Sequence, residues 1–268
     1  MSLDLPAPAH EVCTTFLAEI DSAAQGLVTG LYLRGGLGFG EFVPGRSDVD
    51  FVATLARRPG STDVEALRGA HATVAERHPG QPFDGLHVLA GDLAAPPDDC
   101  PDVPCVIHGL FEPVAREDLN PVAWHEVARH GVTVRGPQPA ALDVWTDDEV
   151  LLAFTRENLD TYWRDSAAAL AKFPAEAGTE TSCEWCVLGV ARLHHLLVTG
   201  AMTTKSGAGR WGLTHYDERF HPVLREALRI REGGIREYDD VALRGTDAAA
   251  FTAYVVDAGT SPDPGRRR

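Results

Sequence analysis

The feature that most constrains this chain is the stretch from Leu31 to Ala53. An apolar segment ends at Gly35 and Gly36, a loop rich in glycine and proline follows, and a second apolar segment opens with two aspartates. Since Gly and Pro interrupt regular structure, this pattern predicts a strand, a loop and a second strand. It does not fit a dinucleotide-binding fingerprint, because no helical pattern follows Gly40.

The two aspartates, Asp48 and Asp50, are separated by one residue, so in a strand they project from the same face. Two adjacent carboxylates repel each other unless a cation lies between them, and Mg²⁺ binds one or two carboxylates together with phosphate oxygens. Gly35 and Gly36 would let backbone amides approach a phosphate closely. We therefore predict a metal site at the aspartates and a phosphate cradle at the glycines; the simpler alternative is a hairpin with a solvated acidic turn.

This pattern resembles the signature of the DNA polymerase β-like nucleotidyltransferase superfamily, in which a hydrophobic strand ends in Gly-Gly or Gly-Ser and Asp-hydrophobic-Asp opens the next strand. The resemblance implies an α/β (α+β) domain with a small mixed sheet, with helices on one side. It also implies Mg²⁺-dependent nucleotidyl transfer with ATP as co-substrate. Attack at the α-phosphate, with pyrophosphate leaving, follows from the resemblance as well.

Further segments resemble the aminoglycoside adenylyltransferases that modify streptomycin and spectinomycin. They are Ser47–Asp50, Gly109–Pro113, His130–Pro137, Val190–Leu193 and Thr199–Trp211. The resemblance implies a C-terminal helical-bundle domain, with ATP and the acceptor bound between the two domains. It assigns Arg192 and Lys205 to the nucleotide phosphates and places Ser47 among the nucleotide-binding residues. Lys205, which we place in a loop between helices, is one of only two lysines in the chain.

The resemblance also implies a third carboxylate on a neighbouring strand, which acts as general base. The segment Gly85–Ala90 is the corresponding strand, and it carries His87 at that place. Four interpretations stay open. His87 accepts the proton, which its ordinary pKa permits; Asp84 supplies the carboxylate; the base is absent and the chain only binds nucleotide; or the predicted register is shifted by a residue or two.

The organisation of the chain changes after Gly136 and Pro137. Before this point, predicted strands and helices alternate, including one possible strand over residues 105–111. After it, only helices are predicted, over residues 147–173, 182–199 and 220–231. We predict a nucleotidyltransferase domain over residues 1–142, a helical domain over residues 143–260 and a disordered tail over residues 261–268.

Composition limits the function. The net charge of −15 argues against nucleic-acid binding and is compatible with a cationic substrate, or with solubility alone. The resemblance implies a small cationic acceptor, such as an aminoglycoside or aminocyclitol, whose hydroxyl receives AMP. No apolar run approaches the about 20 residues that span a bilayer. The five cysteines are an odd number at unrelated spacings, which favours a reduced, cytoplasmic setting, and we expect a monomer. The alternatives are a nucleotide-binding pseudoenzyme or regulatory module, and an enzyme of this fold that modifies a protein or an RNA.

Overall fold

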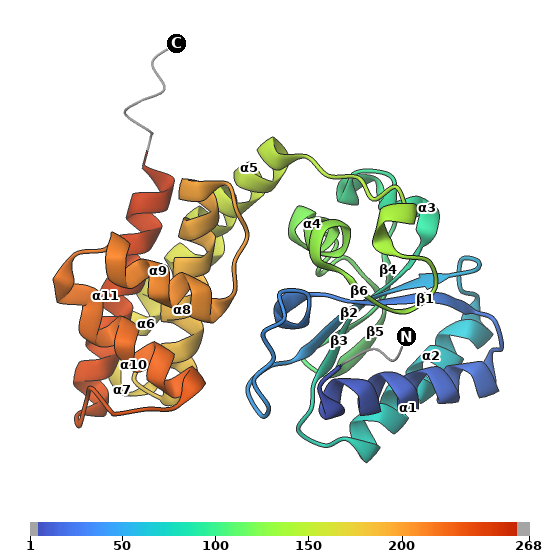
Figure 1. Cartoon of the computed structure of the whole chain (residues 1–268), viewed down its shortest axis with the longest axis horizontal. Helices are drawn as coiled ribbons and strands as arrows, with labels where there is room; N and C mark the ends of the chain where they lie inside the picture. Colours follow the sequence, from blue (N-terminus) through green and yellow to red (C-terminus); the bar gives the residue numbers. More distant parts are fainter. Residues whose placement is uncertain (1–4, 262–268) are drawn as a thin grey trace, which may run out of the picture. The chain divides into compact units, whose positions relative to one another are not determined.

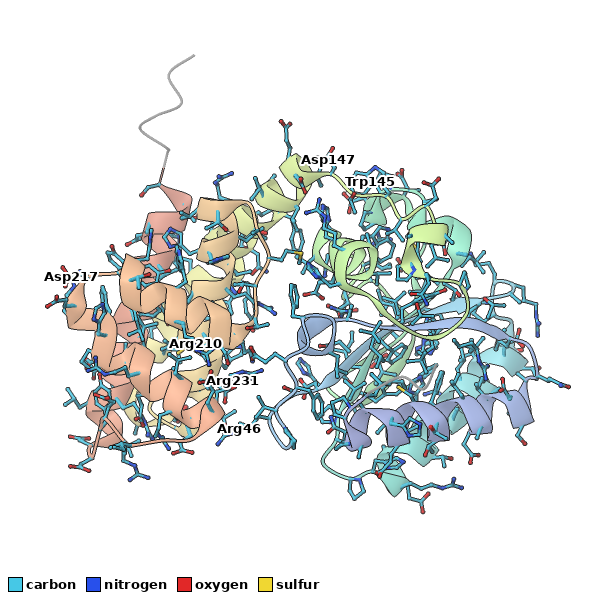
Figure 2. All side chains as sticks on the ribbon, viewed as in Figure 1. Arg46, Trp145, Asp147, Arg210, Asp217 and Arg231 are labelled. Carbon is cyan, nitrogen blue, oxygen red and sulfur yellow. The ribbon has the colours of Figure 1, made fainter. Side chains whose placement is uncertain are left out.

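The computed structural model describes residues 5–261, and the chain divides into two units, Met1–Asp147 and Asp148–Arg268 (Figure 1). The division lies later than the predicted boundary after residue 142. The reason is that the segment with Trp145 and Asp147, both labelled in Figure 2, still belongs to the first unit. The backbone N–H of Trp145 donates to Leu93 O at 2.7 Å. Apart from Ser261, the predicted tail lies outside the described residues.

A six-stranded mixed sheet forms the centre of the first unit. Its spatial order is β5-β4-β3-β2-β1-β6; β2 and β3 are parallel, and the other neighbours are antiparallel. The strands are β1 (Val28–Leu33), β2 (Val49–Leu55), β3 (Phe83–Leu89), β4 (Val103–Ile107), β5 (Leu110–Ala115) and β6 (Val132–Arg135). The mixed sheet of the predicted fold class is thus confirmed.

The single strand predicted over residues 105–111 is wrong, because the chain reverses within it. His108 and Gly109 both have positive φ, 51° and 75°, and form the two-residue turn between β4 and β5. Positive φ at both central residues is the geometry of a tight hairpin turn. This turn has a role at the site described below.

Helices cover both faces of the sheet, whereas the resemblance implied helices on one side only. The helices α1 (Ala7–Ala23) and α2 (Ser61–Arg77) pack on the face that presents Phe51, which we call the α2 face (Figure 1). The opposite face presents Val52 and is covered by α4 (Pro121–His130) through Trp124; we call it the α4 face. Both faces are apolar, so both must be covered. The short helices of this unit are α3 (Ala90–Leu93) and three 3-10 turns, Gly35–Leu37, Pro97–Asp99 and Pro139–Ala141.

The second unit is helical, as predicted. Its elements are α5 (Asp148–Asn158), a π-helical turn (Leu159–Trp163), α6 (Arg164–Lys172), α7 (Pro174–Ala177), α8 (Glu180–Thr199), α9 (Lys205–His215), α10 (His221–Glu232) and α11 (Val241–Thr260). The sequence patterns did not predict α9 or α11. The three glycines within α9 lower its helix propensity and hid it. Lys205 is therefore the first residue of a helix and not part of a loop.

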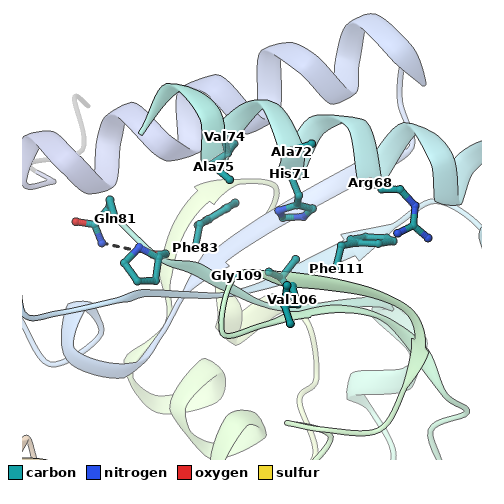
Figure 3. Close-up of a pocket in the computed structure, with 12 residues that line it drawn as sticks. Arg68, His71, Ala72, Val74, Ala75, Gln81, Phe83, Val106, Gly109 and Phe111 are labelled. Atoms are coloured by element: carbon teal, nitrogen blue, oxygen red, sulfur yellow. Dashed lines mark hydrogen bonds between the residues drawn. The ribbon is translucent and has the colours of Figure 1, made fainter. Parts of the chain in front are cut away.

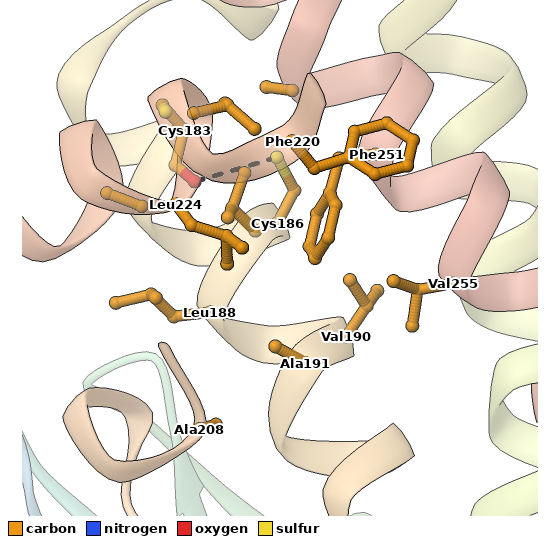
Figure 4. Packing of buried hydrophobic residues seen from close by; sticks show 14 of the residues in the cluster. Cys183, Cys186, Leu188, Val190, Ala191, Ala208, Phe220, Leu224, Phe251 and Val255 are labelled. Atoms are coloured by element: carbon orange, nitrogen blue, oxygen red, sulfur yellow. Dashed lines mark hydrogen bonds between the residues drawn. The ribbon is translucent and has the colours of Figure 1, made fainter. Parts of the chain in front are cut away.

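The core of the helical unit contains the Cys-x-x-Cys pair of α8 (Figure 4). The Cys186 thiol donates to Cys183 O at 3.7 Å, within the same helix. Burial raises the pKa of Cys186 to about 11, so this thiol stays protonated and packs as an apolar group. All five cysteines are buried and form no disulfide. In the described part of the chain, no helix is both long and apolar enough to cross a membrane.

Candidate functional site

The aspartate pair lies where the loop after β1 enters β2. Asp48 is exposed and directly precedes the first strand residue, Val49, whereas Asp50 is half-buried within β2. Asp50 shares the α4 face with Val52, because side chains alternate along a strand. The backbone N–H of Arg34 donates to Asp50 O at 2.9 Å, which joins the end of β1 to the start of β2. The glycine turn that follows Arg34 is thereby held beside the Asp50 carboxylate.

Gly35 is required at this position for two reasons. Its φ is +58°, a left-handed conformation that favours glycine, and a Cβ here would collide with Asp50 Oδ2. At Gly36 a Cβ would instead collide with the backbone carbonyl of Glu41. Gly35 therefore lets the backbone of the turn lie against the Asp50 carboxylate, and Gly36 lets it lie against the Glu41 carbonyl.

A third carboxylate, Asp84, lies beside Asp50. The parallel register pairs Asp50 with Asp84, so the two residues project from the same face of the sheet. The backbone N–H of Gly109, in the β4–β5 turn, donates to Asp84 Oδ1 at 3.0 Å and orients the carboxylate. Burial raises the pKa of Asp84, and the negative charge of Asp48 adds to the rise. Asp84 is thus a carboxylate of increased basicity next to the aspartate pair.

His87 lies on the other face. It is 1% exposed and packs against Phe51 on the α2 face. Its Nδ1 donates to Pro104 O at 3.0 Å, so its Nε2 accepts from His71 Nε2 at 3.1 Å. Burial lowers the pKa of His87 to about 4. The structure does not bring His87 to the aspartate pair, and of the four interpretations of the third strand, this geometry fits Asp84.

His71, the partner of His87, lines a cavity of about 210 Å³ between α2 and the sheet (Figure 3). Its walls include the rings of Phe83 and Phe111, and the guanidinium of Arg68 lies 4.9 Å from the centre of the Phe111 ring. None of the site carboxylates lines this cavity. The cavity belongs to the α2 face, whereas Asp50 lies on the α4 face; Gly109 lines the cavity and also donates to Asp84.

Three charged residues that the sequence analysis missed surround Asp50: Arg34, Asp118 and Glu126. Arg34 is 7% exposed and forms ion pairs with Asp118 and with Glu126, the latter at 3.0 Å. Burial raises the pKa of Asp50 to about 6; Arg34 opposes this rise, and the charges of Glu126, Asp118 and Asp48 add to it. Sequence signals could have indicated two of these residues. Arg34 directly precedes Gly-Gly, and Glu126 lies among the apolar residues of a helix.

The residues present fit a divalent cation. The half-buried Asp50 lies near several carboxylates, and a cation would offset their mutual repulsion. In the described ranges no group of three or more His, Cys, Asp or Glu side chains could hold a metal by itself. Mg²⁺ takes one or two carboxylates and completes its shell with phosphate oxygens and water. Asp48 and Asp50 stay the predicted ligands.

Ser47 shapes the loop that precedes the aspartates. Its Oγ accepts from Val43 N at 3.0 Å, and its own N–H donates to Val43 O at 2.8 Å. In the helical unit, Arg192 is half-buried on α8. Lys205 is half-buried at the N-terminus of α9, directly after the capping residue Thr204. Donors at a helix N-terminus suit an anion, and the roles of these three residues stay predictions.

The burial of His87 predicts a pH-dependent stability. Between pH 6.5 and pH 4 the unfolded chain binds a proton that the folded His87 does not, so the free energy of unfolding should fall as the pH falls through this window. The loss expected from His87 between pH 7 and pH 5 is about 2 kcal/mol. Urea unfolding at both pH values measures it. His87→Asn, which can still donate to Pro104 O, should reduce the loss, and the exposed control His10→Asn should not; an equal loss in both variants would contradict the prediction.

Comparisons with known proteins add to this geometry. Residues 159–258 match the family model described as the aminoglycoside adenylyltransferase, C-terminal domain. No curated protein matches the sequence. The fold is similar to that of spectinomycin adenyltransferase AAD(9) from Enterococcus faecialis, solved with ATP and spectinomycin. The TM-score is 0.67 at 12% identity, over 92% of this chain and 99% of that chain.

The family model matches the helical unit from the π-helical turn into α11, and the structural similarity extends over the first unit as well. The similar structure supports the predicted combination of a nucleotidyltransferase domain with a helical domain. Residues 159–258 are thus similar to the C-terminal domain of the aminoglycoside adenylyltransferases, and the chain as a whole has the fold of a spectinomycin adenyltransferase.

Proposed function

We propose that this enzyme transfers AMP from ATP to a hydroxyl of a small cationic acceptor, such as an aminoglycoside or aminocyclitol, and that it requires Mg²⁺. The observation that carries the proposal is the pairing of Asp84 with Asp50 on one face of the sheet, beside Gly35. The structure of similar fold, solved with ATP and spectinomycin, supports the choice of nucleotide and of acceptor class. The proposal places the reaction in the cytoplasm, where ATP is available, and the protein acts as a monomer.

In this proposal Asp48 and Asp50 hold the metal, which when bound would neutralise charge on the triphosphate. Gly35 and Gly36 form the proposed phosphate cradle, and Ser47 keeps the loop before the aspartates in shape. Arg192 and Lys205 of the helical unit add positive charge for the phosphates. Such charge-assisted contacts are stronger than neutral hydrogen bonds.

Asp84 is the proposed general base. It accepts the proton of the acceptor hydroxyl, the oxygen attacks the α-phosphorus, and the bond to pyrophosphate breaks. Burial raises the pKa of Asp84, which increases its strength as a base, and the bond from Gly109 N fixes its direction. The interpretation as a nucleotide-binding module rested on a missing third carboxylate, and the position of Asp84 removes that reason.

The acidic character of the chain supports a cationic acceptor. The net charge is −15, and the site itself contains more carboxylates than cations. In the helical unit Trp163 and Trp185 lie with ring centres 4.6 Å apart. Two acidic side chains of this unit already form ion pairs: Asp160 with Arg164, and Glu184 with Arg231. Glu157, near the end of α5, is a further acidic candidate for contact with the acceptor.

A panel of aminoglycosides and aminocyclitols, incubated with ATP and Mg²⁺, tests the proposed reaction. Mass spectrometry should detect an acceptor that has gained AMP, together with released pyrophosphate. Asp84→Asn should lower turnover by ~10²–10⁴-fold, because the general base is lost, and should leave ATP affinity nearly unchanged. His87→Asn should retain turnover. No adduct with any acceptor would contradict the proposed function, and full activity of Asp84→Asn would contradict the assignment of the base.

The glycine turn provides a second test with a matched control. Gly35→Ala and Gly40→Ala both place a Cβ at a positive φ, +58° and +71°, but only the first collides with Asp50. Both variants should lose stability, by about 1 kcal/mol or more. Only Gly35→Ala should also lose Mg·ATP affinity, which calorimetry measures. Equal affinities in the two variants would show that the approach of Gly35 to Asp50 does not matter for binding.

A further inference from the structure

A buried ion cluster lies directly beneath the glycine turn. Arg34 is the residue that joins β1 to this turn, and its Nη1 donates to Glu126 Oε2 of α4 at 3.0 Å. Its Nη2 donates to Asp118, in the loop before α4. The same Glu126 Oε2 accepts from the backbone N–H of Gly35 at 3.3 Å. One carboxylate oxygen thus holds both the arginine and the first glycine of the turn.

This cluster contributes little net stability to the fold for the free energy that its burial costs. Removing ions from water costs several kcal/mol for each ion, and a buried ion pair often stabilises no more than apolar residues of the same volume. The cluster is also incompletely satisfied: Arg34 Nε has no hydrogen-bond partner within residues 5–261. Three carboxylates, those of Asp50, Asp118 and Glu126, influence this single guanidinium. Because this surplus of negative charge does not favour folding, we infer that the cluster has a function beyond packing.

Hydrogen bonds and charge connect the cluster to the glycine turn and to Asp50. Glu126 fixes Gly35 N, and the missing Cβ of Gly35 is what lets the turn lie against Asp50 Oδ2. Arg34 fixes Asp50 twice, by its backbone bond to Asp50 O and by the charge of its guanidinium. A displacement of either Arg34 or Glu126 would therefore displace the turn and the Asp50 carboxylate together.

We propose that Arg34 and Glu126 are positioning residues for nucleotidyl transfer: together they hold the Gly35–Gly36 turn and the Asp50 carboxylate in the arrangement that binds the metal. The inference rests on the proposed function, because it assumes that Asp50 is a metal ligand. Neither residue contacts the reacting atoms in this account. Both act through Asp50 and the glycine turn.

The direction in which cation affinity changes when Arg34 is replaced distinguishes a positioning role from a purely electrostatic one. Removal of a positive charge next to a cation site should, by Coulomb's law alone, strengthen cation binding. If Arg34 positions Asp50, its removal should weaken cation binding instead. Partners that orient metal ligands typically contribute about 10–100-fold in metal affinity. Mn²⁺ is the probe, because it accepts the same oxygen ligands and its binding can be followed by electron paramagnetic resonance.

The experiment titrates the full-length protein with Mn²⁺ at pH 8.5, in the parent and in three variants. Arg34→Met removes the charge and should weaken Mn²⁺ binding by about tenfold or more. Arg34→Lys keeps the charge and should recover part of the affinity. The control is Arg135→Met, which breaks the two-bond ion pair of Arg135 with Asp21, at 2.7 and 2.6 Å between β6 and α1. It should lower the melting temperature and leave Mn²⁺ affinity unchanged.

A double-variant cycle tests whether the two residues act as one unit. Glu126→Ala should reproduce the loss of Mn²⁺ affinity, and the double variant with Arg34→Met should be little worse than either single variant. Additive losses, or an Arg34→Met protein that binds Mn²⁺ as tightly as the parent or more tightly, would overturn the inference. If Arg34→Met does not fold, parent-like Mn²⁺ affinity in Arg34→Lys and in Glu126→Ala overturns it. A parent protein that binds no Mn²⁺ and transfers no nucleotide would instead contradict the proposed function.

Discussion

The parallel pairing of β2 with β3 is the constraint on which the site depends. This pairing sets Asp50 beside Asp84 and, because side chains alternate along a strand, places Phe51 and His87 on the opposite face. The β4–β5 turn then reaches Asp84 through Gly109 N. A shift of one residue in this register would exchange the faces: His87 would lie among the carboxylates, and Asp84 would be buried among the aromatic rings of the α2 face.

The second constraint is the concentration of negative charge around one buried arginine. Arg34 favours the ionised form of Asp50, while burial and three other carboxylates oppose it and hold the pKa of Asp50 at about 6. Such a site is stabilised by a cation that brings further ligands of its own, and a metal-bound nucleotide meets this description. Helix α4, which covers the second face of the sheet, thus also supplies part of the buried charge on which the proposed chemistry depends.

The parts of the fold and of the candidate site that depend on neighbouring residues in the sequence could be predicted from it. Glycines followed by alternating aspartates predicted the strand, the loop and the second strand, and the family resemblance predicted the helical second unit. Long-range pairing had no such signal: the choice between Asp84 and His87 depends on which residue of β3 pairs with Asp50, and no local pattern sets that register. Arg34 and Glu126 are 92 residues apart, so their ion pair appears only in the folded chain. Helix α9 was missed because its glycines conceal its periodicity.

The central claim is that Asp48 and Asp50 make ATP binding depend on the metal, and calorimetric titration with ATP tests it most directly. With Mg²⁺ the parent should bind ATP tightly, and without Mg²⁺ it should bind weakly. The double variant Asp48→Asn, Asp50→Asn should bind weakly in both conditions, because the metal ligands are lost. The exposed pair Asp98 and Asp99, changed in the same way, is the matched control and should bind as the parent does. Parent-like binding of Mg·ATP by the Asp48→Asn, Asp50→Asn variant would contradict the account.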